Sequence, residues 1–232
     1  MSIILCIETA TEVCSVAISI EGSCAYEKSL SQVYKHSSGL TPLIDEIMKD
    51  AELSFSDLSA VSISNGPGSY TGLRVGSATA KALCFSLGIP LIALSTLKTI
   101  AAGSVAHMNY TADYLIIPTI DARRMEVYMA VYDSSLHEIS NASNLIYSET
   151  SLREISTTYQ DQTLVVCGNG ATKLEKNFNL PSNITVHPID CSARYQCSLA
   201  FNKYRSTEFV PLVNHKPYYF KAPNITKPKS KL

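Results

Sequence analysis

The sequence predicts an α/β protein of two related lobes, each a mixed sheet flanked by helices. Segments with alternating or continuous apolar patterns, typical of strands, are interspersed with segments whose apolar residues recur every three or four positions, typical of helices. The order strand, strand, strand, helix, strand, helix occurs twice along the 232 residues, and such a repeat indicates two similar units facing each other. Hydrophobic residues make up 46% of the chain and charged residues 17%, which excludes disorder over most of its length.

The first unit opens with the apolar run 3–8, whose lack of alternation predicts a strand buried on both faces. Residues 13–20 alternate between apolar and polar, and residues 24–31 follow a Glu-Gly-Ser turn, so both segments are predicted strands. The elements that follow are a helix at about 39–51, a strand at 60–64, a helix at 70–87 that stops at Gly88, a strand at 91–94 and a helix at 96–106 capped by Ser95 or Thr96.

The second unit begins with residues 114–121, an apolar strand that ends in an acid as 3–8 does. Its other elements are strands at 125–133 and within 136–147, a helix at 149–158, a strand at 163–167 and a helix at 171–178. The expected parts are a first lobe at 1–106 that a helix at 192–206 rejoins, a smaller second lobe at 107–190, and a tail at 207–232.

Composition excludes several classes of protein. The formal net charge is -1, without the basic excess of a dedicated nucleic-acid binder. No apolar run approaches the length of a membrane-spanning helix, and the run 3–7 is too short for the core of a signal peptide. Seven cysteines without a C-x-x-C pair indicate reduced thiols. We therefore expect a cytoplasmic protein with no membrane partner.

A glycine loop, Asn-Gly-Pro-Gly-Ser-Tyr-Thr-Gly at 65–72, lies between a predicted strand and a predicted helix, where backbone N–H groups attract anions. Its spacing is one residue off the dinucleotide fingerprint, no acid occurs between Leu58 and Ala112 to hold a ribose, and no P-loop lysine follows. The repeat places Gly168-Asn169-Gly170 at the same position in the second lobe. Two interpretations stay open, a tight strand-to-helix turn and an anion-binding loop.

Metal chemistry finds little support. The five histidines are far apart in sequence, no H-x-x-x-H occurs, and His107 is the only imidazole within 58–112. We expect no tightly bound divalent metal. Residues 8–11, at the end of the first strand, are either a side of the cleft that positions a hydrated phosphate or a turn capped by its own threonines.

Five stretches resemble the bacterial TsaB (YeaZ) family. They are Ile-Glu-Thr-Ala at 7–10, Cys-Ser-Val-Ala at 14–17, His-Ser-Ser at 36–38, the glycine string 66–76, and Asp-Ala-Arg-Arg-Met-Glu-Val-Tyr at 121–128. The likeness covers residues 1 to about 130 well and the rest in outline. The late Pro-x-Tyr-Leu-Arg pattern of the family appears only as Pro-Tyr-Tyr-Phe-Lys at 217–221.

The resemblance implies an actin-like fold and a non-catalytic role. Members of this family support the paralogue TsaD, which transfers the threonylcarbamoyl group to tRNA, together with the ATPase TsaE. Thr96 and Ile100 stand where TsaD has two metal-binding histidines, and Glu8-Thr9-Ala10 replaces an Asp-Gly-Thr type of phosphate turn. The expected partners are therefore a TsaD-like paralogue, a TsaE-like ATPase, a second copy of the chain when it is alone, and tRNA only within the complex.

Two sets of site residues follow. Weak ATP or ADP binding, in the cleft between lobes or at the partner interface, would use the β-turn and glycine-loop residues Glu8, Thr9, Thr11, Gly66, Gly68, Ser69, Gly168 and Gly170. Helix 70–87 has small residues every four positions, a strip that either packs within this chain or meets a partner. The expected partner interface, shared with helix 39–51, comprises Leu40, Leu43, Ile47, Tyr70, Gly72, Leu73, Arg74, Gly76 and Ala80.

Two other functions stay open, an ATP- or metabolite-binding enzyme of the actin-like class and a glycoprotease-like hydrolase; the missing metal histidines and catalytic triad argue against the hydrolase. In the tail no acid follows Glu208, and its lysines are Lys216, Lys221, Lys227, Lys229 and Lys231. We expect this positive segment to be solvated, with a weak phosphate contact to tRNA as the alternative.

Overall fold

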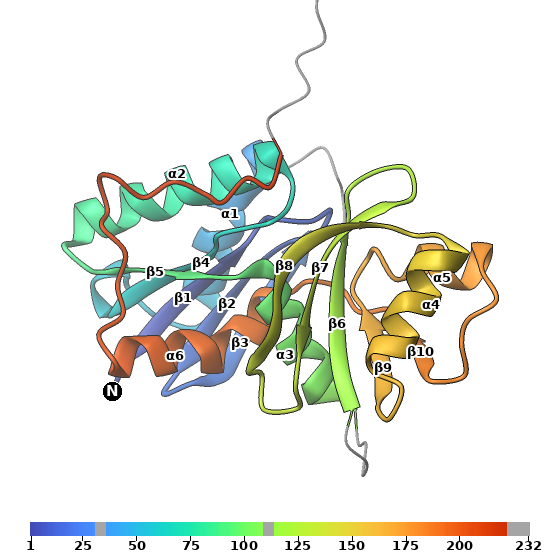
Figure 1. Cartoon of the computed structure of the whole chain (residues 1–232). Coiled ribbons are helices and arrows are strands. Elements are labelled where there is room, and N and C mark those ends of the chain that lie inside the picture. Colours follow the sequence, from blue (N-terminus) through green and yellow to red (C-terminus); the bar gives the residue numbers. More distant parts are fainter. Residues whose placement is uncertain (31–35, 109–113, 222–232) are drawn as a thin grey trace, which may run out of the picture.

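The computed structural model describes residues 1–30, 36–108 and 114–221. Two five-stranded sheets run β3-β2-β1-β4-β5 and β8-β7-β6-β9-β10 (Figure 1). The two orders are equivalent, because each strand of the second lobe takes the place of its counterpart in the first. The predicted duplication of a βββαβα unit is confirmed.

The first sheet is built around β1, which is buried at every position, as its unbroken apolar run predicts. It pairs antiparallel with β2 and parallel with β4. The strands are β1 (Ile3–Glu8), β2 (Cys14–Ile20), β3 (Ser23–Leu30), β4 (Ala60–Ser64) and β5 (Leu91–Leu94).

Helices α1 (His36–Asp50) and α2 (Tyr70–Leu87) cover one face of this sheet, and a short 3-10 turn, η1 (Phe55–Asp57), follows α1. The predicted bounds of α2 are confirmed. The side chain of Ser69 accepts a hydrogen bond from the N–H of Gly72 at its start, and Gly88 ends it in the left-handed conformation with φ 67°.

The other face is covered by η2 (Ala193–Gln196) and α6 (Cys197–Arg205). The expected single helix at 192–206 is thus a 3-10 turn followed by an α-helix. The turn places the side-chain amide of Gln196 3.0 Å from the carbonyl oxygen of Ile7. Within the described residues, no helix has the length and hydropathy to cross a membrane.

The second sheet contains β6 (Tyr114–Asp121), β7 (Glu126–Tyr132), β8 (Glu138–Ile146), β9 (Thr163–Cys167) and β10 (Ile184–His187), with α4 (Glu149–Thr158) and α5 (Thr172–Asn177) on its outer face. Strand β10 is not among the elements predicted from the sequence. It has four residues, too few for a visible alternation, and it is a strand because it pairs parallel with β9.

Helix α3 (Thr96–His107) lies between the two lobes. Its residues Leu97 and Ile100 pack against Ile116 and Val165 of the second sheet. Its first turn is hydrogen-bonded to the first lobe, because the N–H of Thr96 donates to the carbonyl oxygen of Gly66. One helix therefore contacts both lobes within two turns.

Candidate functional site

The candidate site forms where two parallel strands of the first sheet end. The chain leaves β1 at Glu8 and leaves β4 at Ser64, and parallel neighbours end at the same edge of a sheet. The turn after β1 and the glycine loop after β4 therefore meet. The N–H of Ser69 donates to the carbonyl oxygen of Ala10 over 2.6 Å.

Glu8 is fully buried, and its carboxylate is bonded within the chain. It accepts hydrogen bonds from the N–H of Ala10 at 2.7 Å, the side-chain amide of Gln196 at 3.2 Å and the hydroxyl of Ser64. Burial raises the pKa of Glu8 above its ordinary value, although the bonds from Ser64 and Ala10 oppose the shift. The expectation that Glu8 faces a nucleotide is wrong, because its oxygens face the chain's own donors.

Glu8→Gln should reduce the pH dependence of stability. The unfolded chain loses the Glu8 proton near pH 4.5, whereas the folded chain retains it to higher pH because its pKa is raised. The folded state then binds more protons, so the free energy of unfolding falls as pH rises from the unfolded pKa towards the folded pKa. Urea denaturation at about pH 5 and about pH 8 should show that the free energy of unfolding falls less between these two pH values in the variant than in the unmodified chain. An equal loss in both proteins would contradict this.

Thr9 fixes the close approach of α2 to the first strand. Its hydroxyl donates to the carbonyl oxygen of Gly72 over 2.8 Å. A Cβ added at Gly72 would overlap the carbonyl oxygen of Thr9, and one added at Gly76 would overlap the Thr9 hydroxyl. The small residues of α2 therefore face this chain's own β1 turn.

This packing corrects the expected partner interface. Seven of its nine residues lie buried in the first lobe and have no exposed side chain to offer: Leu40, Leu43, Ile47, Gly72, Leu73, Gly76 and Ala80. Tyr70 and Arg74 remain at the surface.

The N–H groups of the first glycine loop are largely used within the chain. The N–H of Gly66 donates to the hydroxyl of Thr96 over 3.2 Å, that of Ser69 donates to Ala10, and the Ser69 hydroxyl caps α2. The tight-turn interpretation of this loop is the one that the geometry supports. The hydroxyl of Thr11 is buried without a hydrogen-bond partner among the described residues.

The second glycine loop packs in the same way on β6. Gly168 has φ 87°, and a Cβ there would overlap the carbonyl oxygen of Thr119. The N–H of Gly170 donates to that oxygen over 3.3 Å, and the Asn169 amide oxygen accepts from the N–H of Asp121 over 3.0 Å. A Cβ at Gly168 would also lie 3.2 Å from Ile100 of α3. Helix α3 thus contacts the first loop through Thr96 and the second through Ile100.

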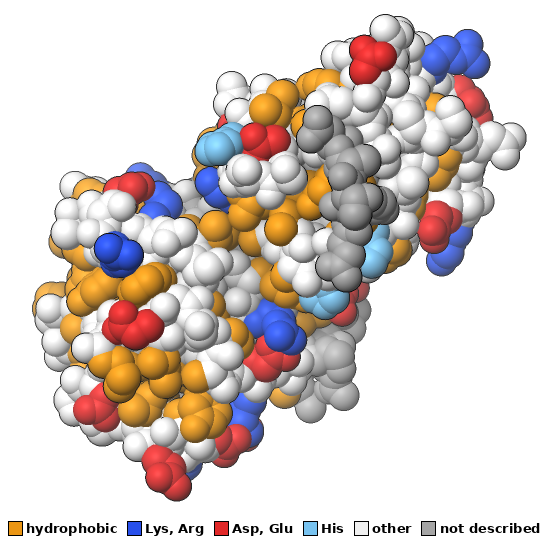
Figure 2. All heavy atoms as spheres, turned by 90° about the horizontal axis from the view of Figure 1, so that it is seen from below, with side chains coloured by type: hydrophobic (Ala, Val, Ile, Leu, Met, Phe, Trp, Pro, Cys, Tyr) orange, Lys and Arg blue, Asp and Glu red, His pale blue; other side chains and the backbone are white. Residues whose placement is uncertain are grey.

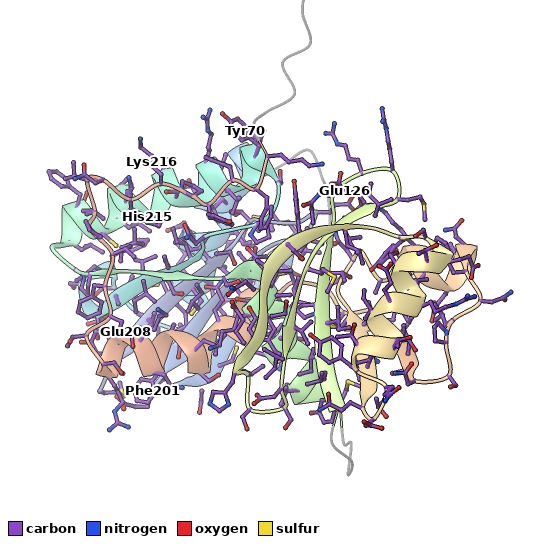
Figure 3. The ribbon with its side chains drawn as sticks, viewed as in Figure 1. Tyr70, Glu126, Phe201, Glu208, His215 and Lys216 are labelled. Carbon is purple, nitrogen blue, oxygen red and sulfur yellow. The ribbon has the colours of Figure 1, made fainter. Side chains whose placement is uncertain are left out.

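The C-terminal strap, residues 213–221, crosses this site. It runs along α2 in Figure 1, and the ammonium of Lys81 donates to the carbonyl oxygen of His215 over 2.6 Å. The N–H of Tyr218 then donates to the carbonyl oxygen of Asn65 over 2.7 Å. Figure 3 shows the labelled residues His215 and Lys216 beside α2, on the way to Tyr70.

The strap ends on the second lobe. The ring of Tyr219 lies 4.9 Å from that of Tyr70, and the ring of Phe220 lies 5.2 Å from that of Tyr128. Lys221 forms an ion pair with Glu126. The expected solvated tail is therefore wrong for residues 213–221, and the three aromatic residues in a row at 218–220 were the signal that this segment would pack. Lys227, Lys229 and Lys231 lie outside the described residues.

The model of the family described as "TsaD: tRNA N6-adenosine threonylcarbamoyltransferase" matches residues 29–185, more than half of the chain. The chain belongs to this family. The TsaB protein of Escherichia coli (strain K12) is 36% identical over 129 residues, which cover 56% of this chain and 54% of that protein. The matched part thus spans about half the length of this relative.

Two solved structures support the fold. YeaZ from Pseudomonas aeruginosa superposes with a TM-score of 0.81 at 24% identity over 95% of this chain and 100% of that one. The activator of 2-hydroxyisocaproyl-CoA dehydratase from Clostridium difficile, solved with bound ADPNP, gives a TM-score of 0.52 at 10% identity over 89% and 97%. The expected actin-like fold of two lobes is confirmed.

The sequence resemblance implies that residues 96 and 100 stand where TsaD has two metal-binding histidines. Here Thr96 and Ile100 are fully buried. The hydroxyl of Thr96 accepts from Gly66, and Ile100 packs in the second-lobe core, so both have structural roles. In the part of the chain that the structure describes, no group of three or more His, Cys, Asp or Glu residues is placed to hold a metal ion.

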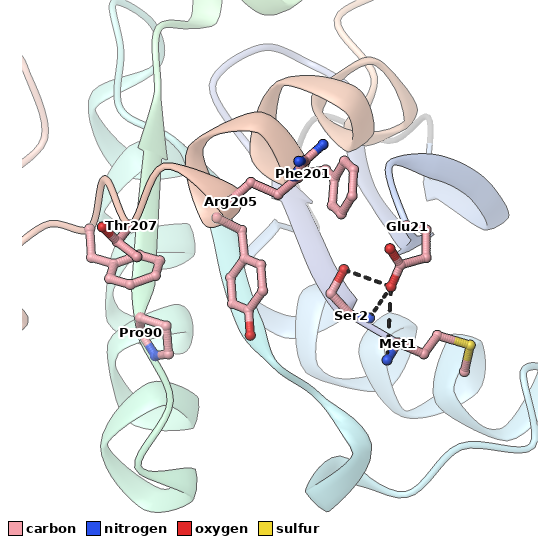
Figure 4. Close-up of a pocket in the computed structure, with 9 residues that line it drawn as sticks. Met1, Ser2, Glu21, Pro90, Phe201, Arg205 and Thr207 are labelled. Carbon is pink, nitrogen blue, oxygen red and sulfur yellow. Dashed lines mark hydrogen bonds and ion pairs between the residues drawn. The ribbon is translucent and has the colours of Figure 1, made fainter.

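A separate pocket of about 690 Å³ lies at the far edge of the first lobe (Figure 4). Phe201, Tyr204 and Arg205 of α6 form one wall, and Glu21 forms hydrogen bonds with Ser2 at the other. None of the predicted site residues lines it, and it contains no cluster of catalytic side chains.

Proposed function

We propose that the protein is a non-catalytic subunit in tRNA N6-threonylcarbamoyladenosine formation that binds a TsaD-like transferase and acts with a TsaE-like ATPase in the cytoplasm. The observation that most directly supports a non-catalytic role is that Thr96 and Ile100 are fully buried. The resemblance implies that these two residues stand where the transferase has metal-binding histidines, and neither can serve as such a ligand here. The printed name of the E. coli relative, a tRNA threonylcarbamoyladenosine biosynthesis protein, supports the pathway.

The solvent-facing stripe of α2 is the partner surface that we propose in place of the buried strip. Arg74, Ala78, Ala82 and Phe85 recur at spacings of four and three along this helix and are all exposed. Phe85 is 80% exposed, which is unusual for a large apolar side chain. We propose that a TsaD-like paralogue covers this stripe, and that a second copy of the chain covers it when the paralogue is absent.

The proposed role is tested by co-purification with the TsaD-like and TsaE-like proteins of the same organism, with and without ATP. Mass spectrometry of tRNA nucleosides then measures threonylcarbamoyladenosine. Formation of the nucleoside by the transferase only when this chain is present supports the proposal. Threonylcarbamoyladenosine formed by this chain alone, or equally well without it, would contradict a supporting role.

The isolated chain should bind neither nucleotide nor divalent metal tightly. The N–H groups of Gly66 and Ser69 are bonded within the chain, and the carboxylate of Glu8 accepts three hydrogen bonds. Titration with ATP and magnesium should give no saturable heat, and elemental analysis should find zinc and iron far below one atom per chain. Saturable micromolar binding of ATP would instead favour the alternative of an ATP- or metabolite-binding enzyme.

A further inference from the structure

Basic side chains without acidic partners gather around the strap. Arg123 and Arg124 are exposed in the turn between β6 and β7, and Lys216 is exposed on the strap. Across the described residues, the structure gives none of these three an ion pair, whereas Lys173 and Lys221 nearby are paired with Asp121 and Glu126. Uncompensated cations on one side of a molecule attract polyanions.

The turn holds its two arginines in an unfavourable backbone conformation. Arg123 has φ 75° and Arg124 has φ 53°, in the left-handed region that hairpin turns usually fill with Asn, Asp or Gly. Backbone strain of this kind is concentrated at functional sites. Neither side chain has a partner in the described structure that would explain why an arginine stands there.

Aromatic rings lie along the strap and at the start of α2. Tyr218 is 51% exposed, and its ring lies 5.4 Å from that of Phe220. The guanidinium of Arg74 lies 4.0 Å from the ring centre of Tyr70 and donates from Nε to the hydroxyl of Tyr219 over 3.3 Å. Rings held by their neighbours in this way are stacking platforms of the kind that bind unpaired bases.

We call these residues the strap rim: Tyr70, Arg123, Arg124, Lys216, Tyr218, Tyr219 and Phe220. Figure 3 shows Tyr70, Lys216 and Glu126 along the same upper edge of the molecule. The face seen from below in Figure 2 differs, because most of its basic side chains lie beside acidic ones. The rim is therefore a local positive surface on a chain whose formal net charge is -1.

We propose that the strap rim binds a single-stranded stretch of RNA, with phosphates on Arg123, Arg124 and Lys216 and a base stacked on Tyr218. The inference rests on the proposed function in one respect, that the stretch is a loop of the tRNA being modified. Alternating bases and phosphates match both features of the rim. An anionic membrane would use the cations but leave the held rings without a role.

The test is fluorescence anisotropy with labelled tRNA and a labelled single-stranded oligonucleotide of its loop, using the full chain and its complex with the transferase. Arg123→Asn with Arg124→Asn keeps residues that tolerate the left-handed conformation, so the fold should be retained. We expect about tenfold weaker binding, and a salt slope reduced by about 1.4 for two lost phosphate contacts. Tyr218→Ala should weaken binding about fivefold without changing the slope.

The matched control is Arg153→Gln with Arg205→Gln, which removes two positive charges from α4 and α6. Its RNA affinity should equal that of the unmodified chain. The proposal is wrong if the control binds RNA as weakly as the Arg123 and Arg124 variant does. It is also wrong if neither the chain nor the complex binds RNA saturably. A third contradicting result is that vesicles of anionic lipid bind the chain as tightly as RNA does and that Tyr218→Ala does not change their affinity.

Co-purification of the same rim variants with the transferase separates the two proposals. If the rim variants still bind the transferase and bind RNA as tightly as the unmodified chain, only the RNA-binding proposal is overturned. Loss of RNA affinity as expected, with no partner binding even by the unmodified chain, would overturn the proposed function and leave the rim standing.

Discussion

Gly72→Ala should lower the free energy of unfolding by about 3 kcal/mol, at the upper end of overpacking costs. The added methyl group would overlap the carbonyl oxygen of Thr9, which is backbone and cannot rotate away. Differential scanning calorimetry should show the midpoint reduced by about 6 to 12 °C for a chain of this size.

Gly88→Ala is the matched control for this substitution. Nothing lies within 4 Å of a Cβ at Gly88, and its only penalty is the left-handed conformation with φ 67°. We expect a loss of about 1 kcal/mol. Equal losses in the two variants would mean that the close contact between α2 and the β1 turn does not limit stability. By the same geometry, Gly76→Arg is expected to impair folding rather than yield a folded monomer with a damaged interface.

Phe85→Glu should weaken binding to the TsaD-like partner about a hundredfold, because a central apolar anchor dominates an interface and a carboxylate there would be buried unpaired. The fold should not change, since Phe85 is 80% exposed. Surface plasmon resonance against the immobilised partner measures the loss, and circular dichroism checks the fold.

Ile146→Glu serves as the control for that variant. Ile146 is 63% exposed and ends β8 in the second lobe, away from α2. Its partner affinity should equal that of the unmodified chain. If Phe85→Glu binds normally while Ile146→Glu does not, the partner docks on the second lobe.

The helices and strands could be predicted because their causes are local. The unbroken apolar run of β1 and the glycine at the end of α2 act within a few residues. Ser95 caps α3 as expected, since its side chain accepts from the N–H of Lys98. The duplicated order then indicated two equivalent sheets without any knowledge of long-range contacts.

The candidate site could not be predicted to the same degree, because its decisive contacts join distant parts of the chain. Thr9 and Gly72 are 63 positions apart. Periodicity shows that Gly72 belongs to a row of small residues on one side of its helix, but it does not show which part of the protein packs against that row. Glu8 is bonded to Gln196 of the returning chain, a pairing across 188 positions that converts a candidate ligand into a buried structural carboxylate. The strap lies where it does through its contact with Asn65, which no local pattern reveals.

The contacts at Asn65 and Gly66 also have a mechanical consequence. The first turn of α3 is bonded to Gly66, the strap is bonded to Asn65, and both segments go on to the second lobe. These two ties leave the first lobe from adjacent residues, so a rotation of one lobe against the other that preserved both ties would turn about this point. Such a rotation is opposed by the packing of α3 in the core of the second lobe and by the ion pair between Lys221 and Glu126. We therefore expect the angle between the two lobes to stay nearly constant.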